Sequence, residues 1–382
     1  MLKPETSTEH DLFRQTAREF AEKEIAAGYL ERSKIDDFPW ELYRLMGRHG
    51  FLGLNIPPEY GGQGVDAVSM GIALEELGKA DPVAAMLAFF SGVGFFVNEA
   101  ADSIKQDILP RICRGEAVAA YGITEPEAGS DVASIRMKAR RDGDGWVLSG
   151  EKTSVSLISV AESVVVLAKI EEDGEIRGMG IFYVPTGIEG ISRSTFNDMG
   201  ARQIGRGSII FDDVRIPAEN SIGSEGKGFH TIMAGFDLAR AYVSMIAWSI
   251  AYQSNADAIA YVRERTAFGR PIGKFEGIAF GLVEDATLLE AAKLLLYKTF
   301  WLHDMDKPHT MESAMCKWWI PELAVKVIHR SLLVHGHYGY SDELPLQQRL
   351  RDAIGLEIGD GTAEIMKIIL TRELLGRECL PF

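Results

Sequence analysis

The sequence predicts an α+β protein made of three successive units: a helical unit, a β unit and a second helical unit. Three observations support this. Apolar positions recur at helical spacing up to about residue 119; short β-branched runs bounded by Gly, Asp and Pro follow; long helical patterns then return. A chain of 382 residues is long enough to build more than one core. We therefore place the domains at 1–119, 120–228 and 229–382.

The first unit carries amphipathic patterns, with apolar residues on one helical face and charges on the other. Five helices are expected, at residues 9–27, 40–51, 66–80, 84–101 and 103–115. The Pro/Gly-rich stretch "IPPEYGGQGV" at 56–65 breaks the pattern and is expected to be a loop between helices.

The second unit has strand and turn chemistry. Strands are expected in "GWVLSGEKTSVS" (145–156), "ESVVVLAKIE" (162–171), "GMGIFYVP" (178–185) and "GSIIFDDVRIP" (207–217). The stretch "RDGDGW" at 141–146 has some features of a calcium loop. The residues after it supply no spaced oxygen ligands, so we interpret it as a hairpin turn.

The third unit is apolar on almost every helical face. Helices are expected at 229–264, 276–304 and 311–336. Helices of this composition are buried on several sides, which favours a bundle with contacts to other subunits.

Composition excludes some classes of function. The formal charge of −15 argues against a nucleic-acid groove, which needs clustered Lys and Arg, but leaves room for an anionic small ligand. The three cysteines, Cys113, Cys316 and Cys379, stand alone in the sequence, which favours a reducing compartment. The polar, acidic start differs from a signal peptide, and no apolar run approaches the roughly 18 residues that cross a bilayer. We expect a cytoplasmic protein that does not enter a membrane.

Four stretches together resemble the acyl-CoA dehydrogenase family. They are "IPPEYGGQGV" (56–65), "YGITEPEAGSD" (121–131), "RERTAFGRPIGKFE" (263–276) and "HYGYSDELPLQQRLRDAIGLEIGDGT" (337–362). The resemblance implies a helical domain, a central β-barrel or sandwich domain and a C-terminal four-helix bundle. It also implies FAD as cofactor, oxidation of an acyl-CoA thioester between Cα and Cβ, a homotetramer, and an electron-transferring flavoprotein as electron acceptor.

The resemblance also carries cofactor roles onto this chain. The positions that match FAD-binding residues of the family are Tyr121, Ile123, Thr124, Gly129, Ser130, Ser154, Ser156, Arg265, Phe268, Glu276, Gly336 and Thr362. The residue types agree in part: Thr124 and Ser130 offer hydroxyls, and Gly129 lets backbone approach a ligand. The alternative for this stretch is a polar β-turn that enters a strand.

Arg265 is a fixed cation that suits a phosphate, and Phe268 is a flat apolar surface. The matching family residues reach FAD across a subunit interface. The alternative is a helix C-terminus closed by Gly269 and Pro271, and both interpretations can hold together.

Several cofactor positions depart from the family pattern. Its usual glutamine falls at Glu276, where a carboxylate would repel a pyrophosphate, and two further positions carry Leu333 and His337. Cofactor contacts are therefore expected to be partly rebuilt. His335 and His337 lie two residues apart without a third ligand, so no metal site is predicted.

Asp237 and Arg240 lie three residues apart, hence on one helical face. In the family the matching pair holds the pantetheine arm of CoA and braces the catalytic loop; the alternative is a plain intrahelical ion pair. The substrate-binding positions implied by the resemblance are Ser130, Phe236, Asp237, Arg240 and Gly361.

The family's reaction needs a base for the thioester's α-proton while flavin N5 accepts hydride from Cβ. The family carries this base most often as Glu in "IYEGT", and the matching stretch here is "IGDGT", so the role falls on Asp360. A minority place it at a position that is Ala239 here. A buried carboxylate has a raised pKa and suits the role. The alternative is that Asp360 is the N-cap of the following helix, although Thr362 could cap it equally well.

Three large groups are small beside the expected reaction centre. Asp360 is one methylene shorter than Glu, Gly359 replaces a bulky aromatic, and Ser154 replaces the aromatic that commonly flanks the flavin. A straight acyl chain would lose van der Waals contacts in such a site. The expected substrate is therefore cyclic or α-branched, such as cyclohexanecarboxyl-CoA or cyclohexenecarboxyl-CoA.

Other functions fit the same scaffold. A flavin oxidase similar to nitroalkane oxidases, which use Asp as the base, would need no CoA. A dehydrogenase of an acyl group on a carrier protein would meet the same pantetheine arm. A non-enzymatic DNA-binding member and a degenerate structural subunit are further alternatives, and the acidic charge argues against DNA.

Overall fold

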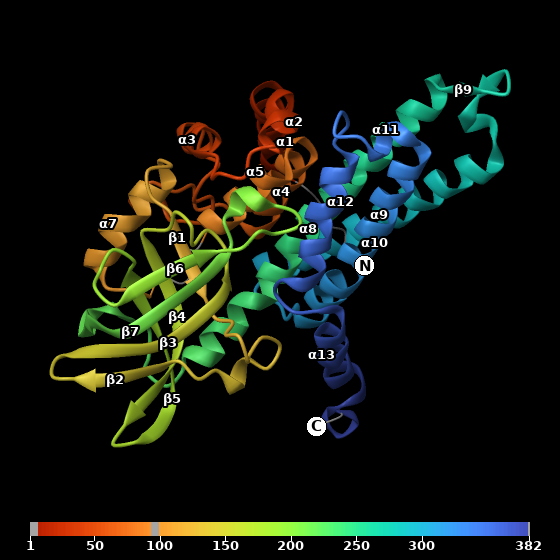
Figure 1. The fold of residues 1–382 in the computed structure, drawn as a ribbon. Coiled ribbons are helices and arrows are strands. Elements are labelled where there is room, and N and C mark those ends of the chain that lie inside the picture. The colour runs from red at the N-terminus through yellow and green to blue at the C-terminus, as the bar shows by residue number, and fades with distance from the viewer. Residues whose placement is uncertain (1–6, 93–98, 381–382) are drawn as a thin grey trace.

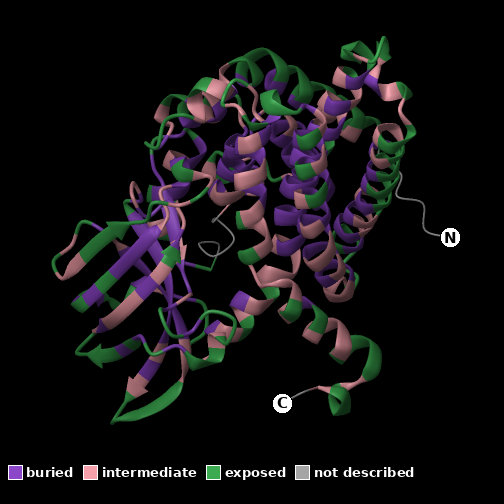
Figure 2. Ribbon diagram, turned by 45° about the vertical axis from the view of Figure 1, so that its right-hand side comes forward, coloured by how far each residue is buried: buried purple, intermediate pink, exposed green. Residues whose placement is uncertain are grey.

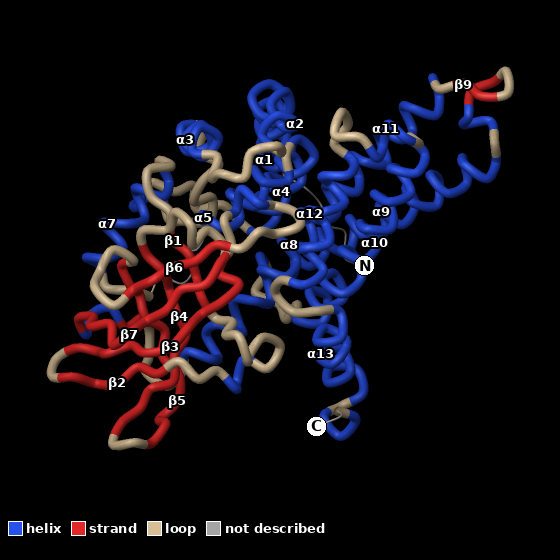
Figure 3. The backbone as a smooth tube through the Cα atoms, viewed as in Figure 1, coloured by secondary structure: helices blue, strands red, loops and turns tan. Residues whose placement is uncertain are grey.

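A computed structural model describes residues 7–92 and 99–380 of the chain. Helices at both ends of the sequence flank one large β-sheet, and a separate two-stranded hairpin lies at the far tip of the helical bundle (Figures 1 and 3). The predicted order of a helical, a β and a helical unit is confirmed.

The first unit contains the predicted helices. They are α1 (Thr8–Phe20), α3 (Trp40–Arg48), α4 (Ala67–Ala80), α5 (Pro82–Ser91) and α7 (Asp102–Cys113); a further short helix, α2 (Tyr29–Arg32), was not predicted. Short polar side chains begin three of them: Ser7 accepts a hydrogen bond from the His10 amide, Asp66 from that of Ser69, and Asp81 from that of Val83. The helix expected at 84–101 is shorter than predicted, because α5 ends at Ser91; residues 93–98 lie outside the described residues.

The β unit forms one mixed sheet. Its strands are β1 (Ala119–Gly122), β2 (Lys138–Asp142), β3 (Gly145–Val155), β4 (Ser163–Glu172), β5 (Glu175–Pro185), β6 (Ile191–Thr195), β7 (Gly207–Pro217) and β8 (Ser221–Ile222). The pairing runs β6-β7-β3-β2-β4-β5-β8, and β1 pairs in parallel with β4. The path is open, so the sheet is not a closed barrel. The stretch "RDGDGW" joins β2 to β3 as the predicted hairpin, in which Asp142 pairs with Gly145.

The last unit is a helical bundle. It contains α8 (Gly228–Glu264), α9 (Glu276–Asp304), α10 (Thr310–Val334), α11 (His337–Tyr340), α12 (Leu346–Ile358) and α13 (Ala363–Leu375). A small hairpin of β9 (Thr266–Ala267) and β10 (Arg270–Pro271) forms the tip between α8 and α9 (Figure 1). The central helix α10 packs against α8, α9, α12 and α13, so the turn between α12 and α13 lies against it.

One hydrophobic core joins the three units. A single cluster of buried residues contains Ala73 of α4, Phe182 of β5 and Trp248 of α8. Figure 2 shows the buried residues along the strands and where the bundle helices face one another. The α4 helix approaches α8 closely at Gly78, where a Cβ atom would lie 2.0 Å from the Ser249 hydroxyl. This shared core fixes the bundle relative to the sheet, and with it the residues that both contribute to the site.

Candidate active site

The turn between α12 and α13 presents Asp360 between two glycines. Asp360 has φ of +56° and Gly361 of +103°, so the backbone is left-handed at both positions. Asp is among the few non-glycine residues that accept this conformation. The N-cap of α13 is Thr362, in extended conformation, and not Asp360. The interpretation of Asp360 as the N-cap of α13 is therefore wrong, and its carboxylate does not cap this helix.

Two buried cations hold the backbone of this turn. Arg240 of α8 donates from Nε to the Asp360 carbonyl at 3.2 Å. Lys317 of α10 donates from Nζ to the carbonyls of Glu357, at 3.2 Å, and Gly361, at 3.0 Å. Arg240 is 7% exposed and Lys317 is 1% exposed. Sequence reasoning missed Lys317; the one available signal was a lysine within the apolar run "SAMCKWWIPELAV".

The carboxylate of Asp360 has a different environment from its backbone. Among the described residues, no hydrogen bond or ion pair reaches its oxygens; both cations bind main-chain carbonyls instead. Burial raises the pKa of Asp360, and the charges of Lys317 and Arg240 oppose that rise only in part. A desolvated carboxylate with a raised pKa and no direct partner can accept a proton.

Asp237 and Arg240 form the ion pair expected from their spacing, with Arg240 Nη1 3.1 Å from Asp237 Oδ1. Thr310 of α10 donates to the other carboxylate oxygen at 2.6 Å, and Ser313 donates to the Asp237 carbonyl. The guanidinium of Arg240 also lies 5.6 Å from the Phe236 ring centroid. Both original interpretations remain open, because one arginine bridges the intrahelical pair and the Asp360 turn.

The end of β1 lies next to the Asp360 turn. Burial, and then the charge of Asp360, raise the pKa of the Tyr121 phenol, which shows that these side chains are neighbours. Below Ile123, the buried Lys152 of β3 donates to the Ile123 carbonyl at 2.9 Å and to Glu125 at 2.8 Å. Burial lowers the pKa of Lys152 to about 8. Sequence reasoning missed this Lys152–Glu125 pair, which supports the backbone of the "YGIT" stretch from beneath.

Three predicted cofactor hydroxyls belong to the "YGITEPEAGSD" stretch and to the residue that follows β3. The Thr153 amide donates to the Thr124 carbonyl at 2.9 Å, which joins the end of β3 to the "YGITEPEAGSD" loop. The hydroxyls of Thr124, Ser130 and Ser156 make no hydrogen bond within the described part of the chain. A Cβ added at Gly129 would meet just the Thr124 methyl, at 3.9 Å. Open backbone and unused hydroxyls fit a polar ligand such as the ring edge and pyrophosphate of FAD.

The expectation that Ser154 leaves empty space beside the reaction centre is wrong in part. The Ser154 backbone is left-handed, with φ of +58°, and its hydroxyl accepts a hydrogen bond from Arg206 Nη1 at 2.7 Å. Arg206 is itself paired with Asp198, through Nε at 2.9 Å. The volume that a serine would leave there is thus partly filled by a guanidinium. Gly359 does leave space, since a Cβ added there would meet only the Gly355 carbonyl at 3.9 Å.

The remaining cofactor positions lie at the tip of the bundle. Arg265 and Glu276 are exposed, Phe268 is 94% exposed, and Gly336 is exposed at the start of α11. Along α8, the 24 residues from Arg240 to Glu264 span about 36 Å at 1.5 Å per residue. One chain therefore does not bring these positions together with Asp360.

Leu333 and His337, which depart from the family pattern, and the nearby His335 lie in different environments. Leu333 is 61% exposed, and the exposed His337 ring packs against Tyr338 at 4.0 Å between centroids. His335 is buried, bonds to the Ser331 carbonyl at 2.8 Å and stacks on Tyr261, so it is a satisfied core histidine. Among the described residues, no group of three metal-ligating side chains comes together. In the same part of the chain, every helix is too short or too polar for a membrane span.

Three family models match most of the chain. The acyl-CoA dehydrogenase N-terminal domain matches residues 7–116, the middle domain 120–214 and the C-terminal domain 226–375. A probable acyl-CoA dehydrogenase of Bacillus subtilis is 34% identical over 379 residues, 97% of this chain and 99% of that protein. The caffeyl-CoA reductase-Etf complex subunit CarC of Acetobacterium woodii is 32% identical over 377 residues, 97% and 99% of the two chains.

A solved structure, that of butyryl-CoA dehydrogenase from Megasphaera elsdenii, superposes with a TM-score of 0.91 at 30% identity, covering 98% of this chain and 100% of that one. The three matched domains follow one another in the order that the fold displays. The chain therefore belongs to the acyl-CoA dehydrogenase family and is an FAD-dependent oxidoreductase that dehydrogenates an acyl-CoA.

Proposed function

We propose that Asp360 is the base of this reaction and that the preferred substrate is a cyclic or α-branched acyl-CoA. The observation that carries the first part is the environment of Asp360. Its backbone is fixed by Arg240 and Lys317, whereas its carboxylate is desolvated and has no direct partner among the described residues. A carboxylate neutralised by a salt bridge would be a much weaker base.

The chemistry then assigns a task to each group. The Asp360 carboxylate takes the α-proton of the thioester, and a double bond forms between Cα and Cβ. FAD, when bound, accepts the hydride that leaves Cβ. Thr124, Ser130 and Ser156, with Tyr121, Ile123, Gly129, Ser154 and Thr362, would hold the cofactor; Phe236, Asp237, Arg240, Ser130 and Gly361 would hold the CoA arm.

The choice of acyl group rests on volume. Gly359 leaves open space beside Asp360, and the shorter acid retracts the carboxylate by roughly one C–C bond, about 1.5 Å. Because Arg206 fills part of the space beside Ser154, that position does not support a bulky acyl group. Gly359 and Asp360 still do. The relatives named above act, by name, on a caffeyl and on a butyryl group, so membership in the family leaves both sizes open.

We also propose that the enzyme is a homotetramer. Arg265, Phe268, Glu276 and Gly336 lie too far from Asp360 to serve the same cofactor within one chain, and a second copy would bring such a tip to the site. Apolar side chains of α9 are exposed, namely Phe280 at 59%, Val283 at 63% and Leu294 at 55%.

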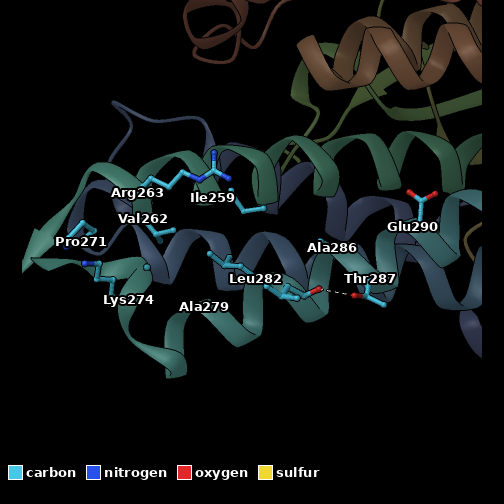
Figure 4. A pocket seen from close by; sticks show the side chains of 12 residues that line it. Ile259, Val262, Arg263, Pro271, Lys274, Ala279, Leu282, Ala286, Thr287 and Glu290 are labelled. Atoms are coloured by element: carbon cyan, nitrogen blue, oxygen red, sulfur yellow. Dashed lines mark hydrogen bonds between the residues drawn. The ribbon is translucent and has the colours of Figure 1, made fainter.

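A cavity of 870 Å³ between α8 and α9 adjoins this surface, lined by side chains that include Val262, Leu282 and Ala286 (Figure 4). A second copy that covered it would bury apolar surface now facing water. Light scattering after size exclusion tests this: a mass near four chains supports the proposal, and one near 42.1 kDa overturns it.

Three further assignments remain proposals. An electron-transferring flavoprotein is proposed as electron acceptor, supported by the relative that forms a complex with Etf. A cytoplasmic location is supported by Cys113 and Cys316, which are buried free thiols. The domain boundaries are kept at 1–119, 120–228 and 229–382.

The deciding experiment is anaerobic bleaching of the bound flavin by butyryl-, isobutyryl-, cyclohexanecarboxyl- and cyclohexenecarboxyl-CoA. Fastest bleaching by a branched or cyclic thioester supports the proposed acyl group. Fastest bleaching by butyryl-CoA overturns that preference and leaves the reaction standing. No bleaching by any thioester would favour an oxidase or an acyl-carrier-protein substrate, for which reduction by a nitroalkane and by the acyl-pantetheine protein are the next assays.

A further inference from the structure

We infer that Lys317 is a positioning residue for Asp360: it fixes both ends of the turn and supplies the charge that lets the half-buried carboxylate ionise. The inference deepens the proposed function, because it takes Asp360 as the base. It assigns a task to a side chain that the motifs do not contain.

The contacts of Lys317 span the whole turn. The Glu357 carbonyl belongs to the last turn of α12, and the Gly361 carbonyl lies just before α13 begins. The last carbonyls of a helix lack intrahelical partners and carry partial negative charge, so a cation is favoured there. One ammonium group bonded to both carbonyls fixes the end of one helix relative to the start of the next. Asp360 lies between these two anchor points.

The position of Lys317 limits how it can act. At 1% exposure it cannot reach solvent or a substrate, and its two bonds go to main-chain oxygens. A buried charge without a functional demand is costly, and an apolar residue could fill the same volume. Lys317 can therefore affect the reaction in two ways: by fixing the backbone of the turn, and by the effect of its charge on Asp360.

The charges around Lys317 come from three neighbouring elements. Asp360 of the turn and Glu357 of α12 favour its charged form, whereas Arg240 of α8 opposes it; Arg372 of α13 acts in turn on Arg240. Burial outweighs the favourable charges and lowers the pKa of Lys317 to about 8, so it is protonated at neutral pH. Lys317 is the stronger of the two cations that oppose the raised pKa of Asp360. Without this charge the base would lose its proton only at higher pH.

The test compares three variants of the FAD-loaded enzyme. Lys317→Met keeps the length of the side chain and removes both charge and donors. Lys317→Arg keeps the charge and the donors. Lys326→Gln is the matched control, because Lys326 is on the same helix and its ion pair, with Glu322 at 3.0 Å, lies on the surface.

For Lys317→Met we expect the acid limb of the kcat/KM profile to move to higher pH, because removing a nearby cation raises the pKa of Asp360. We expect kcat to fall about 100-fold, the size of effect that misplacing a catalytic group by about 1 Å produces. The affinity for the thioester, read from the flavin spectrum, should change little. In Lys317→Arg and Lys326→Gln the acid limb should stay at its wild-type pH.

Hydrogen exchange of the peptide that covers 355–365 gives a second readout that needs no turnover. Faster exchange in Lys317→Met, with Lys326→Gln unchanged, supports the positioning role even if no thioester reduces the wild-type flavin. An unmoved acid limb or unchanged exchange in a Lys317→Met protein that retains FAD overturns the inference. Should Lys317→Met fail to hold FAD, the acid limb of Lys317→Arg decides: a wild-type position supports the role of the charge, and a displaced one overturns it.

Discussion

Two carboxylates of this protein, the buried Glu75 and the half-buried Asp360, are surrounded by cations in opposite ways. Glu75 of α4 is fully buried, and its oxygens bind Lys79 at 2.8 Å, Lys293 at 2.7 Å and Arg14 at 2.8 Å. Asp360 also has two cations close by, but they bind the main chain on either side of it. The distinction lies in which atoms of the acid receive the hydrogen bonds.

The pKa values follow from this difference. Burial alone would raise the pKa of Glu75, yet Lys79, Lys293 and Arg14 together bring it far below its usual value. At Asp360 burial prevails and the pKa is raised. Glu75 is thus fixed as an anion that joins α1, α4 and α9, whereas Asp360 can exchange a proton. Burial and nearby cations do not by themselves mark a base; the proposal for Asp360 rests on an unpaired carboxylate held on a paired backbone.

The largest expected effect is that of Asp360→Asn. Removing a general base costs about 10²–10⁴-fold in rate, so flavin bleaching by the best thioester should slow by about three orders of magnitude. Asn also tolerates left-handed backbone, so the fold and FAD content should be retained. Stopped-flow reduction under anaerobic conditions measures this. A rate within tenfold of wild type would show that another group is the base.

Glu75→Gln should act on stability instead. It leaves Lys293 without its anion and leaves Arg14 and Lys79 with Glu76 alone. Breaking a buried ion pair from one side costs about 3–5 kcal/mol. The denaturation midpoint in urea should fall accordingly, while bleaching by the folded fraction keeps its wild-type rate. Glu41→Gln, at an exposed position of α3, is the control and should leave the midpoint unchanged. If Glu75→Gln slowed flavin bleaching and left the urea midpoint unchanged, Glu75 would act in the reaction and not in stability, and its proposed difference from Asp360 would be wrong.

Acid titration should separate the two carboxylates by sign. Glu75 has a lowered pKa in the fold, so its stabilising contribution is complete above its unfolded value of 4.5 and is lost as pH falls below it. Asp360 has a raised pKa, so its ionisation destabilises the fold progressively as pH rises above 3.8. At pH 7 Glu75→Gln should therefore be less stable than wild type, and Asp360→Asn more stable. In midpoints measured from pH 7 downward, the Asp360→Asn difference should shrink toward pH 4, whereas the Glu75→Gln difference should persist to about pH 4.5 and shrink only below it.

Much of this contrast is visible only in three dimensions. Long amphipathic or apolar runs predicted the main helices, and β-branched runs predicted four strands, since both patterns are local. The strands β1, β2, β6 and β8 were missed: "KARRD" and "ISRST" are too polar, "AAYG" too small and "SI" too short for a strand signal. These segments become strands because neighbouring strands pair with them.

A local motif directs attention to Asp360, whose role as the base stays a prediction. The site was not predictable where a side chain acts on distant backbone. Lys317 bonds a carbonyl 44 residues away, and Arg206 reaches a serine 52 residues before it. No local spacing encodes such contacts, so Lys317 was overlooked and Ser154 was expected to leave empty space.

The smallest effect expected is that of Arg18→Gln, at the rim of the Glu75 cluster. Arg18 binds Glu76 at 3.2 Å with half of its side chain exposed, and Glu76 keeps Arg14 and Lys79 as partners when Arg18 is replaced. Half-exposed pairs are screened by water and salt, so the loss should stay below about 1 kcal/mol and shrink as salt is added. Urea midpoints at low and high salt measure both. If Arg18→Gln were as harmful as Glu75→Gln, the cluster would depend on the number of its ion pairs and not on their burial, and the contrast with Asp360 would need a different basis.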